Sequence, residues 1–400
     1  MLFRMKIGND ASTYLPVFLN DSERYKHALC IGKTGTGKSQ LLLNIWQNDS
    51  YVKVGKILID PSGFLAKDAY SVMKGKAHYC SLKNPISLNP MVAPYKPHQV
   101  ADLIAETVNQ MVSITTPNEK FTVKMLEILN AEIVRCLELG RMTLEEVKAN
   151  IAARQGQAET RDGIIARLNL LLQDDDFKQI VCGQSSFEIN RLIDRQESFI
   201  LDCSEMGFAK KVFVGTLLTN LIKAYFIYGR PKKYKPLIVT IDECHNFVSQ
   251  DFSLVLKEGR KYRIATILAT TDFSTISRPL IHTILSNAGT LICLRAGYIE
   301  ASMLSHEFQT IQAGDIQGLE KYYAYAKTPD GEWQVKLPRP LFVKNVPIAP
   351  VKTTKRNFGL QWFDLPSYSF QLDYDPDGRV AGEDYEQESE TPPHSTREAT

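Results

Sequence analysis

The segment at residues 32–39, GKTGTGKS, constrains the fold more than any other part of this chain. It matches the pattern G-x-x-x-x-G-K-[ST] in full and lies between two apolar runs, HALCI before it and LLLNIW after it. In a strand–loop–helix context this pattern binds phosphates, because glycines let successive N–H groups face the ligand and the next helix adds a favourable dipole. A glycine-rich turn that matches by accident is the alternative, and both flanking elements disfavour it. The predicted nucleotide-binding residues are Gly32, Lys33, Thr34, Gly35, Thr36, Gly37, Lys38, Ser39 and Gln40.

An acidic pair at the end of a later apolar run supplies the second half of such a site. In PLIVTIDECHNF the apolar run ends at Asp242 and Glu243. Lys38 would reach the β- and γ-phosphates of ATP, and the Ser39 hydroxyl would bind Mg²⁺. We expect Asp242, on a neighbouring strand, to hold the same Mg²⁺ through water and Glu243 to polarise the attacking water. Taken by itself, the pair could equally be a solvated strand end.

The adjacent Asp-Glu pair favours an ATPase over a GTPase. The guanine-reading sequence Asn-Lys-x-Asp does not occur in the chain. The cofactors predicted are therefore ATP and Mg²⁺.

Hydrophobic patterning predicts an α/β fold with an all-helical insertion. Short apolar runs without alternation at 27–31, 55–60, 198–202, 236–242, 264–270 and 290–295 are typical of a mainly parallel sheet covered by helices on both faces. Between residues 96 and 187, apolar residues recur every three or four positions, which indicates amphipathic helices. We expect four segments: the N-terminal part of the core at 1–95, the helical insertion at 96–187, the C-terminal part of the core at 188–350 and a tail at 351–400.

Charge and composition set the remaining limits. The net charge of +2 combines −7 from residues 371–400, with nine Asp or Glu and two Arg, and +9 from the rest. The polar, acidic tail has too little apolar surface to offset the entropy of ordering, so we expect it to be disordered. The seven cysteines form no CxxC pair, and the chain has neither a run of 18 apolar residues nor a signal peptide. These features predict a cytoplasmic protein with reduced thiols and no membrane span of its own.

Seven segments together resemble one superfamily. RYKHALCIGKTGTGKS, KILIDPSGFLAKDAY, NPISLNPM, SFILDCSEMGF, VTIDECHNF, EGRKYRIATILATTDFSTI and LSNAGTLICLR occur in the order and spacing of the HerA–FtsK superfamily, over about residues 20–345. The nearest branch resembles the conjugative coupling and type IV secretion ATPases. The resemblance implies a RecA-like P-loop NTPase core with a helical insertion. It also implies a homo-hexameric ring that draws DNA through a central channel, working with a transfer or secretion apparatus.

One position departs from the family pattern, and the pattern leaves open which arginine acts in a neighbouring subunit. The strand after the acidic pair usually ends in Thr-Gln, whose amide senses the γ-phosphate, and here Thr271 stands in the Gln place. Thr271 either takes the sensor role, alone or shared with Thr270 or Asp272, or it only caps the following turn. The resemblance places a charged residue at Arg260, near the subunit boundary, which makes it the first choice for an arginine acting in the neighbouring subunit's site. Surface ion pairing is the alternative for Arg260, and Arg263 and Arg295 are the other candidates.

Two different functions remain possible beside a DNA translocase. One is a secretion ATPase that moves protein or pilus subunits, and the other is a nucleotide-dependent binding module with weak hydrolysis. Direct sequence evidence for DNA binding is limited to lysine-rich segments at 228–236 and 352–356, which can also be solvated loops.

Overall fold

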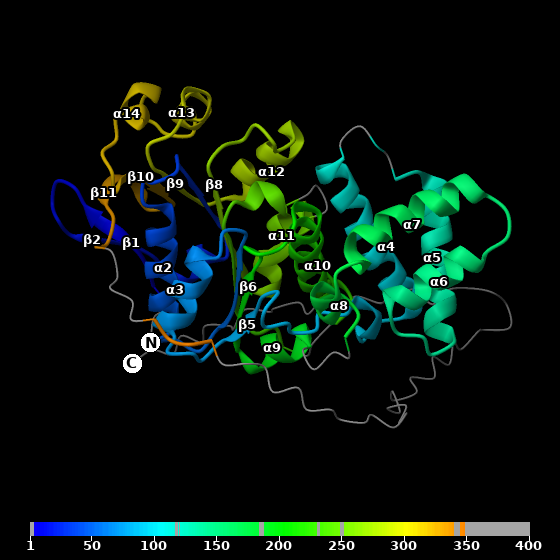
Figure 1. The fold of residues 1–400 in the computed structure, drawn as a ribbon. Helices are drawn as coiled ribbons and strands as arrows, with labels where there is room; N and C mark the ends of the chain where they lie inside the picture. The colour runs from blue at the N-terminus through cyan, green and yellow to red at the C-terminus, as the bar shows by residue number, and fades with distance from the viewer. Residues whose placement is uncertain are drawn as a thin grey trace, which may run out of the picture. The chain divides into compact units, whose positions relative to one another are not determined.

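The architecture is set by one large twisted sheet. The structure is a computed structural model that describes residues 4–116, 119, 121–183, 188–229, 233–248, 252–339 and 345–348. Within these residues an eleven-stranded sheet has the order β2-β1-β11-β10-β9-β3-β8-β7-β4-β6-β5 (Figure 1). Its strands are β1 (Met5–Asp10), β2 (Pro16–Leu19), β3 (Ala28–Ile31), β4 (Gly55–Asp60), β5 (His78–Cys80), β6 (Ser198–Asp202), β7 (Leu237–Ile241), β8 (Ile264–Thr270), β9 (Thr290–Cys293), β10 (Tyr323–Thr328) and β11 (Gly331–Lys336).

The run of strands from β9 to β5 is parallel, and helices cover both of its faces. Alternate residues of β3 enter two separate apolar cores: Leu29 and Ile31 pack in one, Ala28 and Cys30 in the other. The second core contains α2 (Lys38–Asp49) and α3 (Phe64–Val72). The first contains α10 (Phe208–Ile227), α11 (Ser253–Glu258) and α12 (Arg278–Asn287). The predicted α/β fold class is therefore confirmed.

The other strands pair in antiparallel register, and the sequence did not predict them. β10 joins β9 and β11, and β1 joins β11 and β2, in antiparallel register. Burial alternates along β10, so it lacks the continuous apolar run by which the central strands were recognised. Ahead of β3 the chain forms β1, β2 and a one-turn helix, α1 (Asp21–Arg24).

A group of helices lies between β5 and β6 in the chain. It comprises α4 (Pro97–Thr115), α5 (Val123–Glu138), α6 (Leu144–Ala153), α7 (Ala158–Leu172), α8 (Asp175–Val181) and α9 (Ile189–Arg195), drawn in cyan to green in Figure 1. Side-chain caps are present at the starts of α5, α6 and α8. Thr143 and Glu146 form the reciprocal capping box that TLEE predicts for α6, and Asp174 accepts from the backbone N–H groups of Asp176 and Phe177 at the start of α8.

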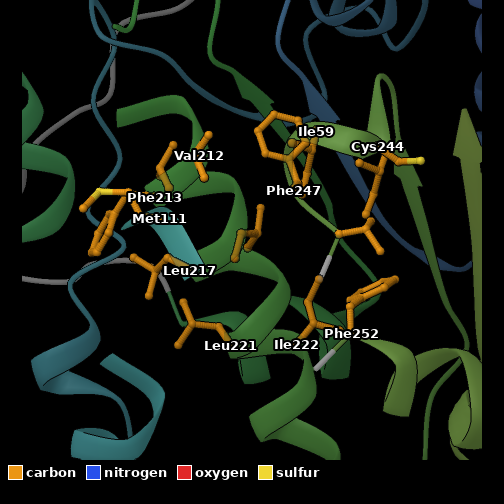
Figure 2. Packing of buried hydrophobic residues seen from close by; sticks show 14 of the residues in the cluster. Ile59, Met111, Val212, Phe213, Leu217, Leu221, Ile222, Cys244, Phe247 and Phe252 are labelled. Atoms are coloured by element: carbon orange, nitrogen blue, oxygen red, sulfur yellow. The ribbon is translucent and has the colours of Figure 1, made fainter. Parts of the chain in front are cut away.

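Helix α10 connects this helical group to the sheet. On one side Asn220 Nδ2 donates to Thr107 Oγ1 of α4 at 3.0 Å. Figure 2 shows α10 between Met111 of α4 and the group formed by Ile59, Cys244 and Phe247. The boundaries of the four predicted segments remain predictions, and the tail at 351–400 lies outside the described residues.

The remaining helices follow β8 and β9. After α12 come α13 (Tyr298–Ser305) and α14 (Ala313–Gln317), and short 3₁₀ turns are present at Pro90–Val92, Cys244–Asn246 and Gly259–Tyr262. None of the helices in the described part of the chain is long and apolar enough to cross a membrane. All seven cysteines are free thiols.

Candidate nucleotide site

The glycine-rich loop runs from the end of β3 to the first turn of α2. Gly35 and Gly37 have φ angles of 79° and 120°, a region that glycine enters readily and other residues rarely do. The Thr36 hydroxyl donates to Lys33 O at 2.7 Å, and Lys33 N donates to Arg295 O, just after β9, at 2.8 Å. These hydrogen bonds within the protein hold the loop in a curved conformation.

Lys38 closes this curve from the helix side. It is the first residue of α2, its side chain is buried, and Nζ donates to Gly32 O at 2.6 Å. The ammonium group therefore joins the beginning and the end of the loop, where phosphate oxygens could replace the carbonyl as its acceptor. Ser39 follows as an exposed residue in the same helical turn. This geometry is the one that a triphosphate requires of the loop.

The acidic pair reaches the same edge of the sheet, but not on the adjacent strand. β8 lies between β3 and β7, with Ile31 level with Thr270 and Leu268 level with Ile241. Two strand spacings separate β3 from β7, roughly 10 Å. This corrects the expectation of a neighbouring strand, and it places the end of β8 between the phosphate loop and the acidic pair.

The electrostatic effects of these groups on one another indicate that they share one region. Burial, followed by the nearby carboxylates of Asp60 and Glu243, raises the pKa of Asp242 to about 7, whereas Lys38 acts in the opposite direction. Burial also raises the pKa of the Cys30 thiol on β3 to about 12, and Lys38, Asp242 and Glu243 all act on that thiol. The lysine and the acidic pair therefore converge around the end of β3.

Asp242 has the properties of a cation ligand. Its side chain is only 4% exposed, and in the described residues its one hydrogen bond is from Glu243 N to Oδ1 at 3.0 Å. A buried carboxylate with a raised pKa and a free oxygen is stabilised by a nearby cation. The donor set of a hydroxyl and a carboxylate is also the type that Mg²⁺ prefers beside substrate phosphates. Ser39 and Asp242 thus fit a magnesium ion.

Glu243 is held in place by the end of β8. Its φ of 43° is unusual for a residue other than glycine, and such strain is concentrated at functional sites. Glu243 Oε2 accepts hydrogen bonds from Thr271 N at 3.2 Å and from Thr271 Oγ1 at 3.1 Å. His245 Nδ1 lies 3.5 Å from the same oxygen and 3.1 Å from Thr270 Oγ1.

Thr271 therefore does something other than cap the next turn. The turn is closed by Asp272, whose carboxylate accepts from Ser274 N at 2.9 Å and from Ser274 Oγ at 2.6 Å. Thr271 contacts the proposed water-polarising residue directly. A sensor role for Thr271 remains a prediction, and the geometry gives it a physical route through Glu243.

Two of the three candidate arginines lie at the edge of the sheet opposite the phosphate loop, and the third lies beside the loop. Arg260 is exposed in the 3₁₀ turn that precedes β8, at the opposite end of a strand about 23 Å long from the phosphate loop. It lies too far from the site of its own chain to act there, so a role in another subunit's site and surface ion pairing are the alternatives that remain. Arg263 lies beside the ring of Tyr25, 5.9 Å away, at the same end. Arg295, in contrast, is an exposed residue next to its own phosphate loop.

Two residues near the site were not identified from the sequence. Asp60 ends β4, is fully buried, and is the carboxylate with the largest effect on the pKa of Asp242. It also accepts from Ser62 N and Ala66 N, which fixes the turn into α3. Tyr322 immediately precedes β10, far along the chain from the loop, and its N–H donates to Thr36 O at 3.0 Å. Asp60 ends the apolar run KILID, so the sequence does indicate an acidic residue at the end of this strand. Nothing in the sequence around Tyr322 indicates its position.

The fold and the site together define a P-loop nucleoside-triphosphatase core. Similar solved structures include the bacterial conjugative coupling protein TrwBΔN70 in its unbound form, with a TM-score of 0.70 and 13% identity, covering 86% of this chain and 92% of that one. TrwB in complex with ADP and Mg²⁺ gives a TM-score of 0.68 at 13% identity, covering 86% and 91%. VirB4 of Thermoanaerobacter pseudethanolicus gives 0.64 at 14% identity, covering 84% and 96%.

At these identities the similarity establishes the fold, which is that of conjugative coupling and VirB4 ATPases. No protein-family model and no curated protein matches the sequence.

Proposed function

We propose that this protein is an ATP-hydrolysing motor, and that it works as a hexameric DNA translocase in conjugative, mobile-element or phage DNA transfer. The observation that carries the proposal is the convergence of Lys38, Asp242 and Glu243 around the end of β3. These groups come from segments about 200 residues apart in the chain, and this is the set that triphosphate hydrolysis requires.

Each side chain has a definite task in ATP hydrolysis. Lys38 exchanges its bond to Gly32 O for bonds to the β- and γ-phosphates. Ser39 and Asp242 would hold Mg²⁺, which would supply positive charge beside the phosphate oxygens. Glu243, oriented by Thr271, accepts a proton from the attacking water and orients it for in-line attack.

Movement of DNA is supported by the likeness in fold to TrwB, which is described as a conjugative coupling protein. The position of Arg260, exposed and far from its own phosphate loop, is compatible with a ring in which it enters an adjacent subunit's site. An arginine supplied in this way accelerates hydrolysis by about 10³–10⁵-fold.

A secretion ATPase is the second candidate, because the fold is equally that of VirB4. A nucleotide-dependent binding module is the third. It is favoured by Thr271 in the place where the superfamily has Gln, since a threonine side chain is shorter and reaches less far.

ATP hydrolysis measured with and without single- and double-stranded DNA tests the proposal. The wild type should be stimulated by DNA, whereas Lys38→Ala and Glu243→Gln should lose hydrolysis. Glu243→Gln should retain ATP binding, which separates loss of chemistry from loss of the site. Hydrolysis that DNA leaves unchanged would exclude a translocase, and turnover insensitive to Glu243→Gln would favour the binding module.

Light scattering with ATP and DNA present tests the assembly. A mass six times that of the 45.2 kDa chain supports the ring, and Arg260→Ala should then reduce hydrolysis without dissociating it. A monomer under these conditions would contradict both the ring and the role of Arg260. Co-purification with secretion components, without affinity for DNA, would instead favour the secretion ATPase.

A further inference from the structure

Tyr322 is pressed against the phosphate loop from the side opposite the acidic pair. Its N–H donates to Thr36 O at 3.0 Å, and its own carbonyl accepts from Leu337 N at 2.8 Å, so its backbone links the loop to the end of β11. A methyl group added at Gly37 would lie 2.9 Å from Cδ1 of Tyr322, which shows how closely the ring covers that glycine.

The backbone of Tyr322 is strained to achieve this contact. Its φ is 69°, in the left-handed region that is a genuine outlier for a bulky residue. Strain of this kind persists where the surrounding structure holds a residue in a functional position. The ring is only half-buried, and the ammonium of Lys321 lies 4.8 Å from its centroid.

The strand order determines which end of a bound nucleotide faces Tyr322. The γ-phosphate has to face Glu243 and Asp242, which lie beyond β8 on one side of β3. The nucleoside must therefore leave the loop on the other side of β3, where β9, β10 and β11 follow in the sheet. Tyr322 immediately precedes β10 and stands on that side.

We propose that the ring of Tyr322 is the stacking platform for the base of the bound nucleotide. This inference rests on the proposed nucleotide site and adds the recognition of the base to it. The ammonium of Lys321 binds the π-electrons of the ring in the free protein, and the base takes its place on that ring face when ATP binds. Tyr322 is a binding residue here, and it has no part in the chemical step.

The alternative is that Tyr322 only holds the loop in shape, and a ligand without a base separates the two roles. Affinities for ATP and for inorganic tripolyphosphate, each with Mg²⁺, should be measured by titration calorimetry on the wild type, Tyr322→Ala and Tyr322→Phe. Tyr323→Ala is a matched control, because Tyr323 is the next residue and its ring packs beside Lys336, 5.5 Å from the ammonium.

Base stacking predicts that Tyr322→Ala weakens ATP binding about 10-fold and changes tripolyphosphate binding less than about twofold. Tyr322→Phe retains the ring and should bind ATP as the wild type does, and so should Tyr323→Ala. Equal weakening of both ligands, or of neither, would overturn the inference while leaving the nucleotide site intact. If the folded wild type bound neither ligand, the proposed function itself would fail.

Discussion

Replacing Asp242 by Asn should abolish hydrolysis and at the same time stabilise the nucleotide-free protein. Burial and two neighbouring carboxylates raise the pKa of Asp242 from its ordinary 3.8 to about 7. The folded protein therefore binds this proton more tightly than the unfolded chain does. The stability that the group contributes is highest below pH 3.8 and is lost as the pH rises from there through about 7.

The size of the change in stability follows from the shift in the pKa of Asp242. A difference of about three pKa units, at about 1.4 kcal/mol per unit, corresponds to about 4 kcal/mol near pH 8 and about 2 kcal/mol near pH 5.5. Asparagine has nearly the same shape and can still accept the hydrogen bond from Glu243 N, so the substitution removes the charge and little else. We expect Asp242→Asn to raise the free energy of unfolding by up to these amounts.

Urea unfolding at the two pH values, without Mg²⁺ or nucleotide, measures the effect. Glu243→Gln is a comparison variant: it removes only one of the carboxylates that raise the pKa of Asp242, so its gain in stability should be smaller. Adding Mg²⁺ and ATP should reverse the order, since the cation favours the charged carboxylate and stabilises the wild type more than the variant. A less stable Asp242→Asn variant near pH 8, or a gain equal at both pH values, would refute the reasoning.

Three further predictions concern the site and its supports. Thr271→Val removes the hydroxyl that donates to Glu243, so kcat should fall about 10-fold at unchanged KM in steady-state assays, and Thr271→Ser should restore it. Asp49→Ala removes the two 2.7 Å hydrogen bonds that the buried guanidinium of Arg24 donates to Asp49. The free energy of unfolding, measured in urea, should fall by roughly 3–5 kcal/mol. Thr143→Ala removes the cap of α6 and should lower the same quantity by about 1 kcal/mol. A loss below about 1 kcal/mol for Asp49→Ala would contradict the estimate for the ion pair. An unchanged free energy of unfolding for Thr143→Ala would contradict the estimate for the helix cap.

The central strands could be predicted because they are buried on both faces. β4, β6 and β8 are buried along their whole length and read as continuous apolar runs in the sequence. β5 is only three residues long, and β11 has a single buried residue, so neither produces such a run. The fold class was therefore accessible from the sequence, whereas the antiparallel part of the sheet was not.

The individual halves of the site could be predicted, but the arrangement between them could not. The phosphate loop and the acidic pair each have a local pattern, because the chemistry depends on adjacent residues. The order of strands depends on packing over the whole chain, and no local pattern placed β8 between β3 and β7. For the same reason the bond from Thr271 to Glu243 and the contact of Tyr322 with Gly37 became visible only in the folded protein.

The segment that carries Glu243 also connects the nucleotide site to the helical insertion. It continues into a 3₁₀ turn and then Phe247, which packs so closely on α10 that a methyl group at Gly215 would lie 2.3 Å from the ring. The carbonyl of Phe247 accepts from Gln110 of α4 at 3.3 Å. A densely packed interior responds to displacement by shifting whole elements. A change in the contact between Glu243 and Thr271 therefore pushes this segment against α4 and α10, which either shift with it or hold it in place. We therefore expect the helical insertion, through α4 and the adjoining helix α10, to respond to the state of the γ-phosphate, although none of the insertion's described residues lies in the site.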